Sequence, residues 1–139
     1  MAEIEVFVEI NASVDKVWEI VSDLDNEPKF WKGTKEVKNI SKNGNVVKRE
    51  IVIAFRDQKC IQEIKLLPKE KIEIVFTKGI IDGNKIISIL TKDNKTILKV
   101  NWNIKLSGIM SMFTSIIKNH IENGTIQSLD KIKEEAESR

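Results

Sequence analysis

The sequence is poor in several residue types on which many protein classes depend. Its 139 residues include one cysteine, Cys60, one histidine, His120, and no tyrosine. A single cysteine excludes an intrachain disulfide, and its place in an apolar stretch is typical of a small buried hydrophobic side chain. So few such side chains leave little material for a metal site or for acid–base catalysis. We therefore expect no metal and no cofactor.

Long apolar runs and targeting signals are also missing. No apolar run approaches the roughly 20 residues of a membrane span, and the first residues, MAEIE, lack the basic and apolar regions of a signal peptide. We therefore expect a cytoplasmic protein. The net charge is +2, from 23 basic and 21 acidic side chains that are interleaved along the chain. Such a balance gives no steering field, so we expect no nucleic-acid partner.

What is present is a series of segments in which apolar residues recur either at the spacing of a strand or at that of a helix. This series predicts one α+β domain over residues 1–139. Residues 3–10 alternate apolar and mostly acidic side chains, as a half-buried strand does. Residues 14–21 show the apolar spacing of one buried helix face, and a second short helical segment follows. From residue 34 to residue 106 the period is two, and regular turn signals divide the region into about six strands.

The last part of the chain returns to helical spacing. Apolar side chains recur on one face over residues 109–137, and such a helix would be roughly 40 Å long. A large antiparallel sheet twists strongly. We therefore expect the sheet to curl around this helix, with the two short helices closing one end. A curled sheet and a helix rarely meet along their whole length, which predicts a cavity between them.

Several phrases spread over nearly the whole chain resemble one known superfamily. The clearest is INASVDKVW at residues 10–18, which is similar to the family's small residue followed by x-x-x-V-W at the start of its first helix. The other matches are segments 21–23 and 28–31, Val37, Gly79, Gly83 and Thr96. In this order they resemble the polyketide cyclase/dehydrase and START-related lipid-transport superfamily.

The resemblance implies a helix-grip fold. In that fold a seven-stranded curved antiparallel sheet wraps around a long C-terminal helix, with two short helices between strands 1 and 2. It also implies a hydrophobic ligand cavity. It implies no particular reaction, because the superfamily includes carriers, cyclases, hormone receptors and chaperone cofactors.

Two patterns supply the candidate ligand-binding residues. The first is strand parity, meaning that every second residue of a strand points to the same face, and the second is the apolar stripe along the C-terminal helix. Arg49 shares parity with Ile51 and Ile53, so it could point inward to a ligand carboxylate or phosphate, although such a residue more often extends out to solvent. Gln62 could be a hydrogen-bonding group in the wall or a satisfied buried amide. The full predicted set is Phe30, Trp31, Arg49, Ile51, Ile53, Gln62, Ile64, Ile74, Phe76, Val100, Trp102, Met112, Phe113, Ile116, Ile117 and His120.

Aromatic and methionine-rich segments add detail to this cavity. Phe30 and Trp31 form an aromatic pair in a loop, which we expect at the cavity entrance together with the 79–83 hairpin. Trp102 falls on the apolar face of its strand, which favours core packing. The segment 109–113, IMSMF, could line the cavity or contact a membrane transiently during ligand transfer, with core packing as the alternative.

Three functions remain open. The leading hypothesis is binding or transport of a hydrophobic small molecule, such as a lipid, isoprenoid or polyketide, without catalysis. The second is a cyclase or dehydratase that uses His120 as its base. The favoured interpretation of His120 is nevertheless a core histidine bonded to backbone or water, or a histidine at the edge of the apolar stripe. The third is a protein-interaction module of the chaperone-cofactor type, which predicts a packed core and an exposed apolar patch. No obligate protein partner is evident.

Overall fold

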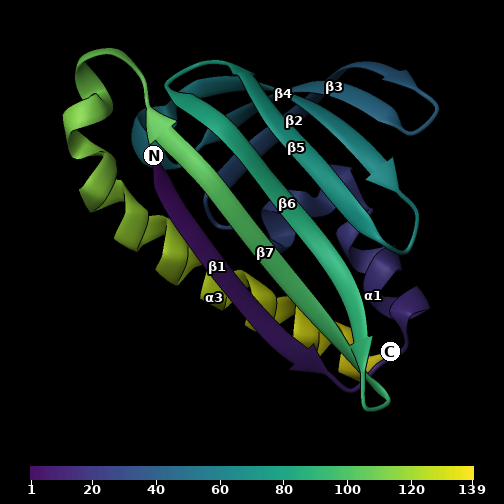
Figure 1. The fold of residues 1–139 in the computed structure, drawn as a ribbon. Coiled ribbons are helices and arrows are strands. Elements are labelled where there is room, and N and C mark those ends of the chain that lie inside the picture. The colour runs from purple at the N-terminus through teal and green to yellow at the C-terminus, as the bar shows by residue number, and fades with distance from the viewer.

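The computed structural model describes residues 1–139 and has the order of elements that the sequence predicts (Figure 1). One strand precedes short helical segments, six strands follow, and a long helix ends the chain. The bounds, with η marking a 3-10 turn, are β1 Ala2–Ile10, α1 Val14–Val21, η1 Leu24–Asn26, α2 Glu27–Phe30, β2 Thr34–Asn43, β3 Val46–Ile53, η2 Phe55–Asp57, β4 Lys59–Leu67, β5 Lys71–Lys78, β6 Ile81–Lys92, β7 Lys95–Leu106, η3 Gly108–Phe113 and α3 Thr114–Ser138.

The seven strands form a single antiparallel sheet in the order β1-β7-β6-β5-β4-β3-β2. Strands β2 to β7 follow one another as neighbours, and β1 pairs with β7 from Ala2 opposite Ile104 to Ile10 opposite Thr96. The sheet is curved, and α3 crosses its concave face with α1 and α2 beside it (Figure 1). This arrangement confirms the predicted helix-grip fold.

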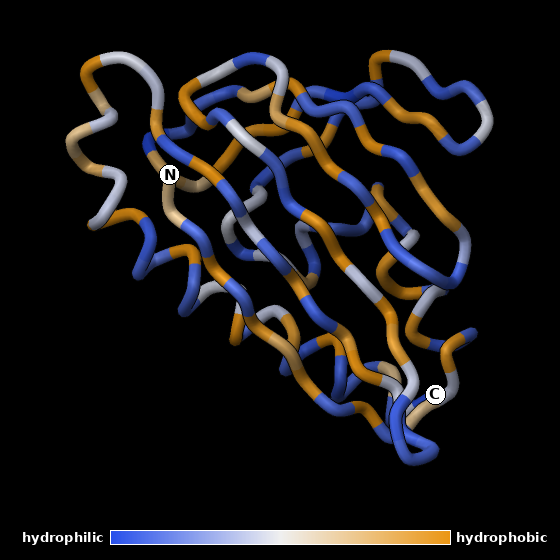
Figure 2. Tube along the Cα trace, viewed as in Figure 1, coloured by the Kyte–Doolittle hydropathy of each residue, from blue (hydrophilic) through white to orange (hydrophobic).

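The alternating sequence pattern explains how the sheet divides its two faces. Figure 2 shows hydrophobic and hydrophilic residues alternating along the strands. In β7, Leu98, Val100 and Ile104 are buried, and Trp102 shares their inward direction. The alternate residues 99, 101 and 103 lie on the other face. Successive side chains of a strand point to opposite faces, so one face meets the helices and the other meets water.

Strands β6 and β7 approach each other closely at Gly83. Its φ is +121°, and a Cβ atom there would collide with the backbone carbonyl oxygen of Asn103. Only glycine adopts this conformation readily and leaves room for the neighbouring backbone. This glycine, one of those in the superfamily resemblance, is therefore needed for strand pairing.

The long helix begins later than its apolar pattern predicts. We expected it from residue 109, but residues Gly108–Phe113 form the 3-10 turn η3 and α3 starts at Thr114. The Thr114 hydroxyl accepts a hydrogen bond from the Leu106 backbone N–H at 3.2 Å and donates one to the Ser111 carbonyl at 2.8 Å. These bonds tie the turn to the end of β7 and set the direction in which the helix leaves the sheet.

The helix α3 has two unlike halves. All of its buried residues lie from Thr125 onward, in the part that we call the sealed half, Thr125–Ser138. The preceding part, Thr114–Gly124, contains no buried residue, and we call it the open half. Leu129 and Ile132 in the sealed half belong to the main hydrophobic core. None of the helices combines the length and the apolar character needed to cross a lipid bilayer.

Polar contacts fasten the sealed half to the start of the chain. The Asn11 backbone N–H donates to Glu137 at 2.8 Å, and the Lys16 ammonium donates to the Arg139 carbonyl at 2.9 Å. Arg139 also lies 3.6 Å from the carboxylate of Glu19 on α1. The sealed half is therefore fixed at its end as well as along its apolar face.

Candidate functional site

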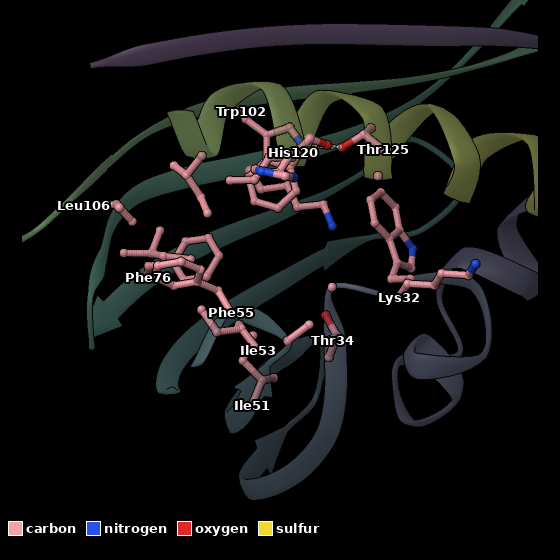
Figure 3. Close-up of a pocket in the computed structure, with 18 of the residues that line it drawn as sticks. Lys32, Thr34, Ile51, Ile53, Phe55, Phe76, Trp102, Leu106, His120 and Thr125 are labelled. Atoms are coloured by element: carbon pink, nitrogen blue, oxygen red, sulfur yellow. Dashed lines mark hydrogen bonds between the residues drawn. The ribbon is translucent and has the colours of Figure 1, made fainter. Parts of the chain in front are cut away.

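A cavity of about 570 Å³ lies between the concave face of the sheet and α3 (Figure 3). The open half forms most of the helix side, and Thr125 and Ser128 at the start of the sealed half also line it. Its floor comes from inward-facing side chains of the strands, and Ile117 and Ile121 of α3 face them. The strand residues of the floor are Ile51, Ile53, Phe76, Ile81, Trp102 and Leu106. The volume lies within the range of about 300 to 1,000 Å³ that is typical of small-molecule sites.

Most of the predicted candidate residues meet at this cavity. The strand residues among them face inward as strand parity predicts, the helix residues lie on the predicted apolar stripe, and Trp31 comes from the predicted loop pair. The predicted residues that line it are Trp31, Ile51, Ile53, Gln62, Phe76, Trp102, Phe113, Ile116, Ile117 and His120.

Six other predicted residues lie elsewhere. Ile64, Ile74 and Val100 are fully buried in the core cluster that also contains Leu129, so the sealed half of α3 leaves no space above them. Phe30 packs against the same cluster, and Met112 in η3 is 75% exposed. Strand parity shows which residues point toward the helix. It does not show how far away the helix is, and this distance decides whether such a residue lines the cavity or lies in the core.

Arg49, the sixth, is wholly buried behind the cavity wall, which contradicts the preferred expectation that it extends to solvent. Its guanidinium donates to Glu27 at 2.6 Å, to the Gln62 side-chain oxygen at 2.9 Å and to the Leu24 carbonyl at 3.1 Å. A buried charge is tolerated when it is paired and its donors are satisfied. Arg49 therefore binds the protein itself rather than the space of the cavity.

Gln62 and Glu27 are held by the same network. Gln62 is buried in the wall, and its side-chain oxygen accepts a hydrogen bond from Arg49, whereas its amide nitrogen donates to no group of the protein. Both Glu27 oxygens are occupied as well, because the Thr34 hydroxyl donates to the second one at 2.7 Å. Burial alone would raise the pKa of Glu27, but the charges of Arg49 and Lys85 and the two hydrogen bonds outweigh it and lower the pKa of this carboxyl.

Lys85 of β6 was not among the predicted site residues. It is 4% exposed and lines the cavity, with Nζ 3.3 Å from the ring centroid of Trp31 and 4.6 Å from that of Trp102. Burial lowers its pKa to about 8, with Glu27 opposing the shift and Arg49 adding to it. Lys85 shares parity with the buried Ile87 and Ile89, so strand alternation could have placed it on the inner face.

His120 lies on the cavity wall and is exposed, which contradicts a bonded core histidine but not a histidine at the edge of the apolar stripe. Figure 3 shows it projecting from α3 on the cavity side. The cause is the open half of the helix, which stands away from the sheet at this turn. A side chain on the apolar stripe here meets space instead of packed neighbours.

The cavity opens between exposed lining residues on two sides. One side is formed by Lys32 and Gly33 before β2 and by Ala54 and Arg56 after β3. The other side is formed by the exposed Phe113, Ile116 and His120. Trp31, which is half-buried, lies next to Lys85 on the side formed by Lys32 and Gly33. The 79–83 hairpin, expected at the entrance, contributes only the buried Ile81 to the wall.

Comparisons with known proteins agree with this geometry. The sequence pattern of a family described as "Polyketide cyclase / dehydrase and lipid transport" matches residues 1–137. Among curated proteins, no sequence matches.

Three solved structures illustrate the shared fold. A Thermus thermophilus protein is 12% identical with a TM-score of 0.84, covering 99% of this chain and 98% of that one. The Zhui aromatase/cyclase of a Streptomyces species is 16% identical with a TM-score of 0.81, covering 99% and 94%. A START superfamily protein from Mycobacterium smegmatis is 18% identical with a TM-score of 0.70, covering 95% and 97%. At these identities the likeness shows the fold alone.

Proposed function

Because this chain belongs to the polyketide cyclase/dehydrase and lipid-transport family, we propose that it binds a hydrophobic small molecule between the sheet and the open half of α3. The ligand we propose is a lipid, an isoprenoid or a polyketide-like molecule that is carried or sensed without chemical change. The same family name covers cyclases and carriers, so the choice between them rests on the cavity itself.

The observation that carries the proposal is an open cavity of about 570 Å³ with mostly apolar walls. Cavities of this size in a packed interior are costly unless something fills them, since interiors are otherwise packed as densely as organic crystals. Leucine, isoleucine and aromatic side chains form most of the floor and the facing helix. An apolar ligand would replace the missing contacts and would remove these side chains from water.

The polar groups of the wall favour binding over catalysis. Glu27 and the side-chain oxygen of Gln62 are both bound by Arg49, and the pKa of Glu27 is lowered, so its carboxyl remains a paired anion. A general base must be free to reach a proton of the substrate. These three residues therefore support the shape of the cavity more directly than they support a reaction.

A cyclase or dehydratase is the second candidate, and the position of His120 favours it. His120 lines the cavity and makes no hydrogen bond to the protein, so its ring nitrogens are free to meet a substrate. The structurally similar Zhui protein is named as an aromatase/cyclase. With a poly-β-ketone substrate, the H120A variant would then abolish turnover while leaving binding nearly unchanged; unchanged turnover would remove this candidate.

The interaction-module hypothesis fits the structure less well, because it predicts a packed core. The exposed apolar side chains of η3 and the first turn of α3 instead border the cavity opening. We propose that this patch, formed by Ile109, Met112, Phe113 and Ile116, contacts a membrane transiently while a ligand enters or leaves.

The test of the proposed function is a titration of the purified protein with Nile red, a neutral apolar dye. We expect saturable binding with one dye per chain, and about tenfold or greater loss in I117W, because the indole would occupy the cavity. The matched control is V75W, which adds the same ring to an exposed position on the sheet's outer face. No saturable binding, or equal binding by both variants, would contradict the proposal.

A further inference from the structure

The ammonium of Lys85 lies at the cavity surface and has no oxygen partner in the protein. Its Nζ faces two indole rings, and neither an ion pair nor a hydrogen bond joins it to the nearby Glu27. Indole faces stabilise a cation, but they leave its three N–H donors without acceptors. A side chain that is 4% exposed and lines a cavity can complete these hydrogen bonds only with something inside the cavity.

The charges around the cavity point to the chemistry of that partner. The lining residues include the cations Lys32, Arg56 and Lys85 and a single carboxylate, Glu27. Glu27 is already neutralised by Arg49, which lies 2.6 Å away. The cavity therefore presents an excess of positive charge over an apolar floor.

Resting on the proposed function, we propose that the ligand is an organic acid, with its carboxylate bound by Lys85 and its apolar body held against the floor. The ammonium would donate to the carboxylate, and the indoles of Trp31 and Trp102 would flank the pair. Burial from water makes such a charge-assisted hydrogen bond stronger than one at the surface. Phe76, stacked with Trp102 at a centroid distance of 6.3 Å, continues the apolar surface away from the carboxylate.

The experiment measures Nile red displacement by two matched pairs of molecules at pH 7. One pair is dodecanoic acid and 1-dodecanol, and the other is 2-naphthoic acid and 2-naphthylmethanol. Within each pair the body is the same and only the acid carries a charge. We expect the acid to bind about 10-fold to 100-fold more tightly than its alcohol in at least one pair, as for a hydrogen bond between charged groups. The pair that binds better distinguishes an aliphatic from an aromatic ligand.

Variants then assign the preference to one residue. K85M keeps the length of the side chain and removes the charge, and we expect it to abolish the preference for the acid while changing alcohol binding by less than about threefold. The matched control is K32M, which removes an exposed lysine from the same cavity. We expect K32M to keep most of the preference.

Three outcomes would overturn the inference. If acids and alcohols bind equally to the unaltered protein, Lys85 does not select a carboxylate, although the cavity still binds apolar molecules. If K32M and K85M lose the preference for the acid equally, the preference comes from the overall positive charge around the cavity and not from Lys85 itself. If no molecule displaces Nile red and the dye itself does not bind, the proposed function fails together with the inference. The comparison on the unaltered protein holds even if K85M folds poorly.

Discussion

The two halves of α3 belong to one continuous helix but have opposite relations to the sheet. In the sealed half, Leu129, Ile132 and Ala136 are fully buried against the core. In the open half, Ile116 is 61% exposed although it lies on the same apolar stripe. One half contributes to stability by packing, and the other leaves space that a ligand could fill.

Side-chain size and hydrogen bonding explain part of the difference. Thr125, Ser128 and Ala136 are small, so the sealed half can approach the sheet closely. The hydroxyls of Thr125 and Ser128 donate to helix carbonyls four residues earlier, at 2.7 and 2.8 Å, and are therefore satisfied while buried. Ile117 and Ile121, which face the cavity from the open half, are larger than Thr125 and Ser128, and the turn η3 fixes where the open half begins. A helix can thus serve as core and as cavity wall without any break in its backbone.

The largest effect that we expect comes from the buried ion pair between Glu27 and Arg49 in the cavity wall. The E27A variant leaves Arg49 buried without its counter-charge, so the free energy of unfolding should fall by about 3 to 5 kcal/mol. Urea denaturation followed by far-UV circular dichroism measures this. In the unaltered protein, the lowered pKa of Glu27 gives stability that is present above the usual carboxyl pKa and is lost as the pH falls through the lowered value. A loss below about 1 kcal/mol in E27A would show that the pair is not part of the cavity's framework.

The second prediction compares the two halves of α3 directly. The L129A variant should lower the free energy of unfolding by about 2 to 5 kcal/mol, since it creates a cavity in the sealed half. The I116A variant in the open half should change it by less than about 0.5 kcal/mol. Thermal and urea denaturation of both variants provide the measurement. Similar losses for the two would mean that the open half also packs tightly.

The third prediction concerns the cost of keeping Lys85 buried. Its pKa in the folded protein is about 8, against an ordinary value of 10.5. Between these values the unfolded chain binds the proton and the folded chain does not, so stability should rise with pH over this window. K85M should remove the rise and should stabilise the protein without ligand at pH 7 by up to about 3 kcal/mol. The same pH profile in K85M and the unaltered protein would contradict this account of Lys85.

The smallest effect on stability should come from the patch beside the opening. Replacing the exposed Ile109 and Met112 by lysine should change the free energy of unfolding by less than about 0.5 kcal/mol. Binding to vesicles of neutral phosphatidylcholine, measured by co-sedimentation, should nevertheless weaken, because the apolar side chains would no longer enter the lipid interface. A control pair of lysine substitutions at Phe7 and Val75, exposed on the sheet's outer face, should leave vesicle binding unchanged. Equal effects of the two pairs would exclude a specific role for the patch.

The sequence predicted the fold well because the fold depends on local patterns. Alternation in the strands and the apolar helix stripe specify which faces are buried, and together with the family resemblance they gave the helix-grip architecture. Strand parity also placed Ile51, Phe76 and Trp102 on the inner face, where the structure has them.

The errors arose where three-dimensional distances decide the outcome. Ile64 and Val100 have the right parity but lie beneath the sealed half of α3, and the sequence of a strand does not show how closely a distant helix approaches it. Arg49 is buried because Glu27, 22 residues earlier, supplies its counter-charge. Lys85 had the parity of a wall residue, but a lysine in an alternating strand ordinarily indicates the solvent face.

The most direct test of the central claim is amide hydrogen exchange along α3, with and without a ligand that displaces Nile red. The account predicts slow exchange in residues 125–136 under both conditions, and faster exchange in residues 114–124 that slows when the ligand binds. Such a result would show that only the open half gains contacts from the ligand. Equal protection of the two halves without ligand, or ligand-induced protection confined to the sealed half, would contradict the division of this helix into core and cavity wall.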